Sequence, residues 1–410
     1  MIKVIVLKKI LLLGGSAQQV IAIKTAKRLG YYTVLCDYLS DNPGQYAADK
    51  YYNVSTTDVE AVYKVSMDEK VDGILAYASD PAALPAAIVA ERLGLPTNPP
   101  ESVAVLGVKH NFRRFLSENG FACPRNFTFN VGEDIEEVKE KIQELHFPIV
   151  VKPTDSSGSK GVTVLKSVEG LDTAIAWAES YSRNKILIVE EFIESNFPAV
   201  IGGDIFVWDG QIILYGEMSC LRGNHGNGLV PIGERHPGGM NEKQINNIHN
   251  ELQRLITALD IRFGELNIEI LLDKEDNVHF LEVGPRAGGN MIPIQLSDIF
   301  GIDLVEANVL AAMGEKPSMN QEKRKGYFVT YVLHSYQNGK FEGVFISDSI
   351  IDNVYRKEIY KEKGDLVEPF DGAGKAIGIL FLHFDTEMEL NCFCANTEKL
   401  VSISLMYRRT

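Results

Sequence analysis

The stretch GELNIEILLDKEDNVHFLEV, residues 264–283, has the pattern of a β-hairpin, with two apolar runs joined by a short polar turn. If Asp273 is paired with Val278, Glu269 lies directly opposite Glu282, with Cβ atoms about 5 Å apart on one face. Two carboxylates so placed repel each other unless a cation or a shared proton lies between them. The hairpin therefore predicts a cation-binding pair of glutamates.

The oxygen-bearing face of this hairpin indicates which cation it would bind. Glu265, Asn267 and Glu269 share the face of Glu282, and the alternate residues are apolar. Such ligands suit Mg²⁺ or Mn²⁺, and Mg²⁺ usually needs substrate phosphates to complete its shell. The alternative is a solvated strand pair whose carboxylates lie apart. The next residues, GPRAGGN, favour the metal site because Arg286 supplies a guanidinium for anions and the glycines allow close backbone approach.

Two upstream segments have features of a nucleotide site. In residues 150–162, VVKPTDSSGSKGV, a strand ends in Lys152 and is followed by small hydroxyl and glycine residues and Lys160. Backbone N–H groups of such a loop can surround phosphate oxygens, although the spacing is not that of a Walker loop. The alternative is a surface hairpin with an exposed lysine. In residues 188–194, IVEEFIE, an apolar strand ends in acids and could offer backbone groups to an adenine edge.

The two ends of the chain differ in pattern from this middle part. Residues 10–13 and 17–29 begin an alternation of apolar runs with helical patterns, which predicts a parallel sheet covered by helices. The turn at residues 14–16, GGS, lacks the G-x-G-x-x-G spacing, so nicotinamide binding is not expected. Beyond Pro317, short strands and turns predict a small α+β unit.

Composition excludes several classes of protein. The 410 residues favour two or three domains, and 55 acidic against 41 basic residues give a net charge of −14. This charge disfavours nucleic acid or an anionic membrane as a partner. The five scattered cysteines fit a reducing compartment, and we expect Cys392 and Cys394 to be buried strand residues. No stretch reaches the roughly 18 apolar residues of a membrane span, so a cytoplasmic protein is expected.

In their order and separation, these segments resemble the ATP-grasp superfamily, in particular its carbamoyl-phosphate-synthase-like and L-amino-acid-ligase-like carboxylate–amine ligases. The similarity covers about residues 10–315. It implies an α/β and α+β fold, the ATP-grasp fold, in which two subdomains clamp ATP. The implied units are an N-terminal Rossmann-like parallel-sheet (pre-ATP-grasp) domain over 1–105, an ATP-grasp domain over 106–316 with a lid subdomain at about 125–193, and a small C-terminal α+β domain over 317–410.

The resemblance also implies which residues form the site. The implied ATP-binding residues are Lys109, Lys152, Ser156, Ser157, Gly158, Ser159, Lys160, Gly161, Glu190, Glu191, Phe192, Ile193 and Asp204, the last where glutamate is usual. Glu269 and Glu282 match the carboxylates that hold Mg²⁺ or Mn²⁺, and Arg286 matches the arginine that steadies the transferred phosphoryl group. The family commonly reads E-x-N-x-R here, and Gly284 stands at the asparagine position. Asn267, Asn290 or water would then replace that metal ligand.

The activity that the resemblance implies is ATP-dependent carboxylate–amine ligation. A small carboxylic acid, with an amino acid as one candidate, becomes an acyl phosphate, which an amine attacks with release of ADP and phosphate. Lys152 and Arg286 are the expected catalytic residues, and Arg222 would pair with a substrate carboxylate. His225 or His236 could accept a proton from the amine, unless this loop is merely solvated.

Two other activities use the same ATP site and stay open at this level. One is a bicarbonate-activating carboxylase component, which needs an acceptor partner. The other is an ATP-binding regulatory protein with low turnover, for which Gly284 is the motive. The expected partners are small-molecule carboxylates and amines, and the family's habit favours a homodimer through the N-terminal domain.

Overall fold

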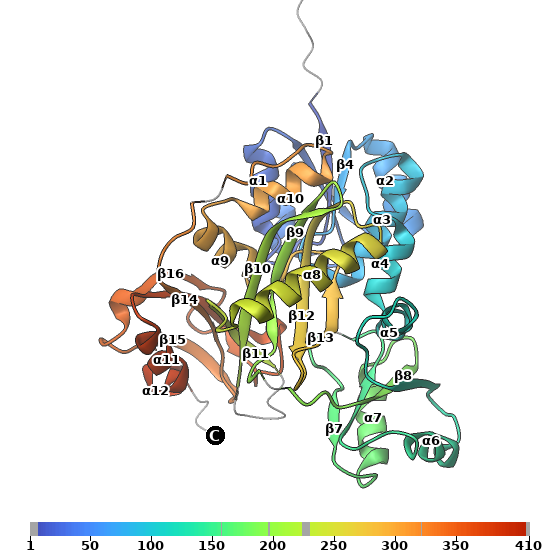
Figure 1. Cartoon of the computed structure of the whole chain (residues 1–410). Helices are drawn as coiled ribbons and strands as arrows, with labels where there is room; N and C mark the ends of the chain where they lie inside the picture. Colours follow the sequence, from blue (N-terminus) through green and yellow to red (C-terminus); the bar gives the residue numbers. More distant parts are fainter. Residues whose placement is uncertain (1–6, 157, 196, 224–229, 321, 407–410) are drawn as a thin grey trace, which may run out of the picture.

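The computed structural model describes residues 7–156, 158–195, 197–223, 230–320 and 322–406. The described strands form four sheets, and Figure 1 shows how they follow one another along the chain. The short 3₁₀ helices are η1 (Pro43–Tyr46), η2 (Ile351–Asn353) and η3 (Ala373–Lys375). None of the helices in these ranges has both the length and the apolar character that a membrane crossing needs.

The N-terminal unit is a parallel sheet with helices around it, as predicted. Its strands lie in the order β3-β2-β1-β4, and all their pairings are parallel. Ile10 and Leu12 face one hydrophobic cluster and Leu11 and Leu13 another, so β1 is buried on both faces, as the apolar run requires. The elements are β1 (Lys9–Leu13), α1 (Val20–Arg28), β2 (Tyr32–Asp37), β3 (Lys50–Asn53), α2 (Val59–Glu69), β4 (Gly73–Leu75) and α3 (Asp80–Leu93).

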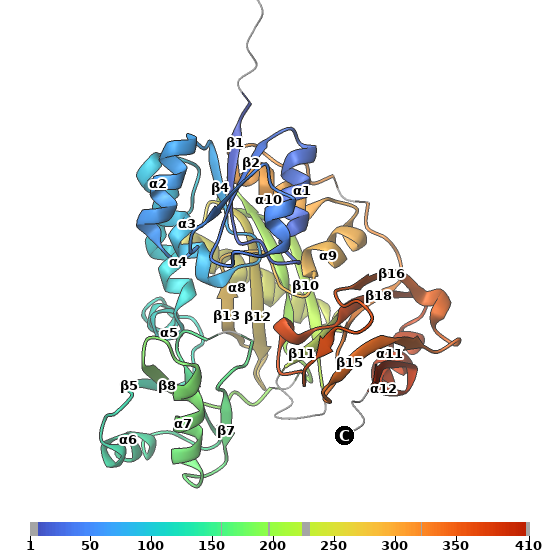
Figure 2. The same ribbon diagram turned by 180° about the vertical axis from the view of Figure 1, so that it is seen from behind.

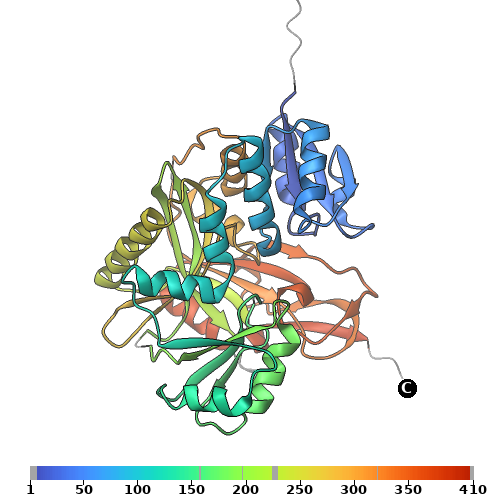
Figure 3. The ribbon, with the colours of Figure 1, turned by 90° about the vertical axis from the view of Figure 1, so that its right-hand side faces the viewer.

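A second, smaller unit is called the lid unit here, and Figure 3 shows it joined to the rest through α4 and α5. Its sheet has the order β5-β8-β6-β7 and packs against its own hydrophobic cluster, which includes Ile149, Val151 and Val189. The elements are α4 (Pro100–Gly107), α5 (Lys109–Glu118), β5 (Asn126–Asn130), α6 (Ile135–Ile142), β6 (Ile149–Pro153), β7 (Thr163–Leu165), α7 (Leu171–Tyr181) and β8 (Ile186–Glu191).

An eight-stranded sheet, the central sheet, runs in the order β13-β12-β9-β10-β11-β14-β18-β16. Helix α8 covers one face, where it packs against Ile205 and Val207, and α9 and α10 cover the other, where they pack against Phe206 (Figures 1 and 2). The alternation of these three residues therefore fixes both layers. The elements are β9 (Ile201–Trp208), β10 (Gln211–Arg222), β11 (Pro231–His236), α8 (Glu242–Ala258), β12 (Phe263–Leu272), β13 (Val278–Gly284), α9 (Ile292–Phe300), α10 (Leu304–Ala312), β14 (Tyr327–Leu333), β16 (Val354–Ile359) and β18 (Gly378–Phe384).

The last part of the chain, the C-terminal unit, adds β14, β16 and β18 to the central sheet and forms a three-stranded sheet of its own in the order β17-β15-β19. Its remaining elements are β15 (Gly339–Ile346), β17 (Leu366–Val367), α11 (Glu387–Ala395), α12 (Thr397–Leu400) and β19 (Val401–Met406). The predicted domain boundaries at 105, 316 and about 125–193 stay predictions.

The expectation for two cysteines of this unit is wrong. Cys392 and Cys394 lie in α11 rather than in a strand, and Cys392 is exposed. The helix begins at a capping box in which the side chains of Thr386 and Glu389 each bond the other's backbone N–H. Leu390 and Phe393 are the buried residues of this helix, and their spacing of three positions is typical of a helix.

Candidate active site

Glu269 and Glu282 are direct partners across β12 and β13, as the sequence predicts. Nearer the turn the predicted register is off by one residue, because Leu272 and not Asp273 is paired with Val278. The two registers meet at a β-bulge next to Glu269, where Leu281 is the extra residue of β13. Such bulges are common beside active sites, because they redirect a side chain.

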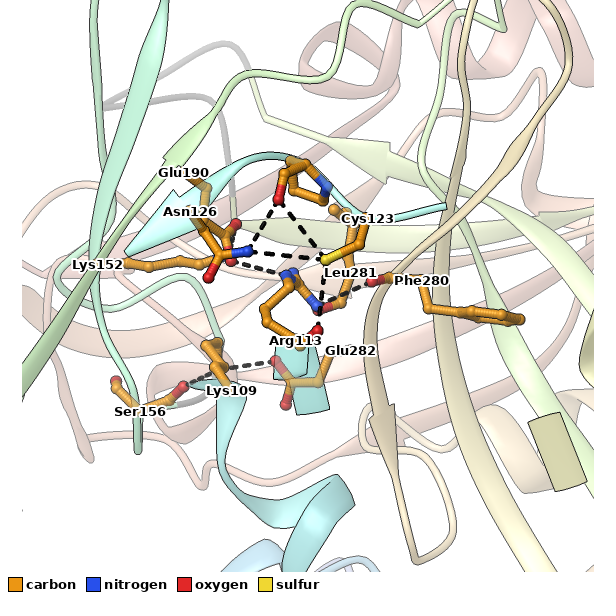
Figure 4. A network of polar contacts seen from close by, with 11 residues as sticks. Lys109, Arg113, Cys123, Asn126, Lys152, Ser156, Glu190, Phe280, Leu281 and Glu282 are labelled. Atoms are coloured by element: carbon orange, nitrogen blue, oxygen red, sulfur yellow. Dashed lines mark hydrogen bonds and ion pairs between the residues drawn. The ribbon is translucent and has the colours of Figure 1, made fainter. Parts of the chain in front are cut away.

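Lysine charge lies beside this pair of glutamates. Lys109, the first residue of α5, places Nζ 3.1 Å from Oε2 of Glu282 and donates to the carbonyl oxygen of Ser156 at 2.5 Å (Figure 4). Burial and the charge of Glu282 raise the pKa of Glu269. The site therefore holds two mutually repelling carboxylates with one lysine as a partial counter-ion.

A buried triad forms the next layer of the site (Figure 4). The carboxylate of Glu190 accepts from Arg113 Nε at 2.7 Å and pairs with Lys152 Nζ at 2.6 Å. Burial alone would raise the pKa of Glu190, but the two cations lower it to about 2. Burial also lowers the pKa of Lys152, and Glu190 opposes this shift. The triad thus holds the ionised carboxylate of Glu190 beside Lys152, which lies in β6.

Arg113 is a site residue that the sequence interpretation missed. It is only 1% exposed, and its two terminal nitrogens each donate at 3.0 Å, to the carbonyl oxygens of Phe280 and Leu281. It therefore ties α5 to the strand that carries Glu282. The signal that could have found it is its position four residues after Lys109, on the same helical face.

A cavity of about 410 Å³, called the first cavity, lies between the lid unit and the central sheet. It brings together most of the residues predicted for ATP and metal, from both sides. Those that line it are Lys109, Lys152, Ser156, Gly158, Ser159, Lys160, Glu190, Glu191, Phe192, Ile193, Arg222, Glu269 and Glu282. Gly161 is not among its lining residues and packs against Pro153 and α7 instead. Ser157 and His225 lie outside the described residues.

A second cavity, of about 530 Å³, adjoins the first and shares Glu269 and Glu282 with it. All three parts of the chain line it: Ser16, Gln18 and Asp80 come from the N-terminal unit, Asn267, Arg286 and Asn290 from the centre, and Tyr360, Gly372 and Ala376 from the C-terminal unit. The two glutamates therefore stand at the junction of two compartments.

The residues around Gly284 answer the question that this glycine raises. A Cβ at Gly284 would lie 3.0 Å from Cζ of Arg286, whose Nε donates to Asp80 at 2.6 Å, so the guanidinium occupies the space of a side chain at 284. Asn267 uses its amide N–H groups on Gly203 and Asp204. In contrast, Oδ1 of Asn290 is buried and has no hydrogen-bond partner in the described part of the chain. These bonds of Asn267 leave its own Oδ1 available, so Asn267 and Asn290 both stay candidates for the replacement ligand.

Two predicted residues do not reach either cavity. Asp204, expected at the ribose, is fully buried and accepts from Gly288 N and Asn267 Nδ2, both at 2.8 Å. Burial raises its pKa, and it shares a hydrogen bond with Glu265. His236 is 7% exposed, and burial lowers its pKa to about 4. Both side chains are buried away from the cavities, Asp204 against Gly288 and His236 against the ring of Phe300.

This fold, with lysines, a glycine-rich loop and facing glutamates around one cleft, defines an ATP-grasp protein. The chain belongs to the family described as "Carbamoyl-phosphate synthase L chain, ATP binding domain", whose model matches residues 109–319. The protein is therefore an ATP-grasp enzyme, of the ligase class that forms C–N bonds.

Individual proteins resemble this chain over different shares of their length. The formate-dependent phosphoribosylglycinamide formyltransferase of Bacillus velezensis is 29% identical over 292 residues, which cover 68% of this chain and 71% of the relative. The carbamoyl phosphate synthase large chain of Thermotoga maritima is 22% identical over 63% of this chain, but the chain spans only 23% of that relative. The crystal structure of an L-amino acid ligase from Bacillus licheniformis has the same fold, with a TM-score of 0.80, 19% identity and coverage of 98% and 99% of the two chains.

Proposed function

We propose that the protein is an ATP-dependent ligase that activates a small carboxylic acid as an acyl phosphate and joins it to an amine. The observation that carries this proposal is the position of Glu269 and Glu282, which face each other where the first cavity meets the second. One compartment offers lysines and a glycine-rich loop to a triphosphate. The other offers space and polar groups to the reacting acid and amine.

The chemistry explains why two compartments must meet. A carboxylate is a poor electrophile, because its charge repels the amine and oxide is a poor leaving group. Transfer of the γ-phosphoryl group of ATP to a carboxylate oxygen gives ADP and an acyl phosphate. Attack by the amine nitrogen then forms the C–N bond and releases phosphate and a proton. Such transfers need positioning and charge neutralisation more than covalent help from the protein.

The side chains of the first cavity suit the first step. Lys109 and Lys152 would neutralise phosphate oxygens, and the loop that includes Lys160 would cover them and exclude water. Arg286 lines the second cavity beside the glutamates, where it would stabilise the charge of the transferred group or of the acyl phosphate. Arg222 would meet a substrate carboxylate from the edge of the first cavity.

The donor set also fits the magnesium ion that this function requires. Glu269, Glu282 and Asn290 would hold it through oxygen atoms, and the buried, unpartnered Oδ1 of Asn290 is the observation that supports this assignment. The described residues contain no group of three or more metal-binding side chains of the His, Cys, Asp and Glu types. This matches Mg²⁺, which usually takes one or two carboxylates and completes its shell with phosphates and water. When bound, the ion would neutralise phosphate charge.

The test is ATP cleavage that depends on both substrates. The protein is incubated with ATP, Mg²⁺ and pooled small carboxylates, amino acids included, with and without pooled amines. Phosphate release is followed, and condensation products are sought by mass spectrometry. We expect phosphate release and new condensation masses to require both a carboxylate and an amine. E282Q should lower both by about 100-fold or more.

Lys166 supplies the matched control, because its side chain is exposed and lies beyond the loop. K166Q should keep the wild-type rate. Cleavage that depends on bicarbonate alone would instead identify a carboxylase component, and tight ATP binding without cleavage would identify a regulatory protein. Full activity of E282Q would show that the site assignment is wrong. The homodimer and the cytoplasmic location stay predictions.

A further inference from the structure

Glu234 is a buried acid in the second cavity to which the proposed reaction gives no role. It lies in β11 and is 6% exposed. Its carboxyl group contacts the thiol of Cys220, which is the residue of β10 paired with Glu234. Its Oε2 is buried and has no hydrogen-bond partner among the residues that the structure describes. A carboxylate oxygen left unsatisfied at the wall of a cavity costs free energy unless a ligand reaches it.

The backbone at Glu234 is held by side chains from two other elements. Its N–H donates to Thr330 Oγ1 at 3.0 Å, and its carbonyl oxygen accepts from Gln295 Nε2 at 2.9 Å. Both of these partners are themselves buried. This fixed backbone sets the direction of the side chain, as a binding residue requires.

A glycine in a neighbouring strand leaves space for the carboxyl group of Glu234. This group reaches across β10 to β9, where a Cβ added at Gly202 would lie only 3.1 Å from Oε1 of Glu234. Any larger residue at 202 would push the carboxylate aside. The absence of a side chain at Gly202 thus leaves room for the carboxyl group of Glu234 on this face of the sheet.

The other unsatisfied polar atoms of the same cavity are chiefly acceptors. The hydroxyl group of Tyr360 has no partner in the described chain, and Oδ1 of Asn290, also unpartnered, is the proposed metal ligand. The cations Arg286 and Lys361 line this cavity too, and Arg286 donates to Asp80 at 2.6 Å. Arg222 is near enough to act on the charge of Glu234 but lines the first cavity. The unpartnered oxygens of Glu234 and Tyr360 therefore suit a ligand group that carries several hydrogen-bond donors, and the carboxyl group of Glu234 favours a cationic one.

We propose that Glu234 binds the protonated amine of the acceptor substrate. The amine is then a primary aliphatic amine, which is cationic at neutral pH, rather than an amide or an aromatic amine. An ammonium group has three donors, which match the carboxylate oxygen and the acceptor atoms around it. This inference rests on the proposed ligase function and names the chemical class of its second substrate.

The experiment compares a charged with an uncharged nucleophile in E234Q. Wild type and variant receive ATP, Mg²⁺ and the pooled carboxylates, with either hydroxylamine, which is largely uncharged at neutral pH, or a pool of L-amino acids and aliphatic diamines. Hydroxamates report acyl phosphate formation, and condensation masses report use of the ammonium substrate. We expect E234Q to keep hydroxamate formation within about twofold and to lose at least tenfold in condensation at sub-saturating amine, through a raised KM.

E217Q is the matched control, because Glu217 lies on β10 with its carboxylate 3.2 Å from His249 of α8, on the other face of the sheet. It should leave both reactions unchanged. Equal losses of both reactions in E234Q would indicate a merely structural role, and no loss in either would also overturn the proposal. A wild-type protein that forms neither hydroxamate nor ADP with any carboxylate would instead refute the proposed function, and the assignment of Glu234 with it.

Discussion

Lys109 and Glu282 form an ion pair of 3.1 Å although Glu282 also faces Glu269 across the strands. The lysine comes from α5 and the glutamate from β13, so this pair joins a helix of the lid unit to the central sheet. Without bound ligands, Lys109 is thus the cation paired with Glu282, whereas Arg222 and Lys109 both act on the charge of Glu269. An arriving metal ion and triphosphate would take over that role and free the lysine for phosphate oxygens.

Replacing Lys109 tests this exchange. K109M should weaken ATP binding about 10- to 100-fold, because a charge-assisted contact to phosphate is lost. It should also lower stability by about 1 kcal/mol without Mg²⁺, since the pair is partly exposed. Titration calorimetry and thermal unfolding with and without Mg²⁺ measure both effects. K166M is the control, and a K109M protein with unchanged ATP affinity would contradict this role.

Replacing Arg113 tests the buried triad. R113M should destabilise the protein by about 3–5 kcal/mol, because Glu190 then keeps only one of its two cations in a fully buried place. R114M changes the next residue of the same helix, which is exposed, and should have little effect. Denaturant unfolding of both variants makes the comparison. Similar unfolding curves for the two would exclude an energetic role for the triad.

Replacing Asn290 tests the substitute for the family's missing asparagine. N290A should raise the Mg²⁺ concentration needed for half-maximal turnover about tenfold, because a ligand oxygen is removed. ATP binding measured without metal should not change. Removal of metal with EDTA should abolish turnover of wild type, and added Mg²⁺ or Mn²⁺ should restore it. An unaltered Mg²⁺ requirement in N290A would leave Asn267 or water as the ligand.

The buried acid Glu234 gives the stability a pH dependence. In the protein without ligands, burial raises the pKa of Glu234 to about 8, and Glu269 adds to the shift while Arg222 opposes it; a bound ammonium group would lower this pKa and favour the carboxylate. Because the unfolded chain then loses this proton first, the stabilising contribution is complete below about pH 4.5 and is lost as the pH rises to about 8. The loss amounts to roughly 5 kcal/mol at most.

Thermal unfolding at pH 5.5 and pH 8 measures this effect. E234Q has no such titrating proton. The Tm of E234Q minus the Tm of the wild type should therefore increase as the pH rises. A Tm difference that is the same at both pH values would mean that Glu234 is already ionised at pH 5.5.

Local pattern explains what the sequence predicts well. The Glu269–Glu282 pair follows from a two-residue period and a short turn, which act over a few residues. No sequence pattern indicates the bulge at Leu281. This bulge shifts the register by one residue, so that Glu269 is paired with Glu282 although Leu272 is paired with Val278. Arg113 escapes notice because a basic residue four positions after Lys109 is equally typical of a solvated helix face.

Long-range pairing explains the rest. The carboxylate of Asp204 is buried against Gly288 because of the strands that flank it. A local sequence pattern cannot predict those neighbours. Glu234 meets its cavity only because β11 pairs with β14 from the C-terminal unit, nearly a hundred residues later. The two cavities are products of this assembly.

The continuous central sheet has a mechanical consequence. Strands β11 and β14 join the centre to the C-terminal unit by backbone hydrogen bonds, so these two parts must travel as one rigid frame. The lid unit has a separate sheet and is attached through α5 and the single bridge between Ser195 and Asp273 among the described strands. We therefore expect nucleotide to enter by movement of the lid unit at that attachment, whereas the strand that bears Glu234 is held within the central sheet.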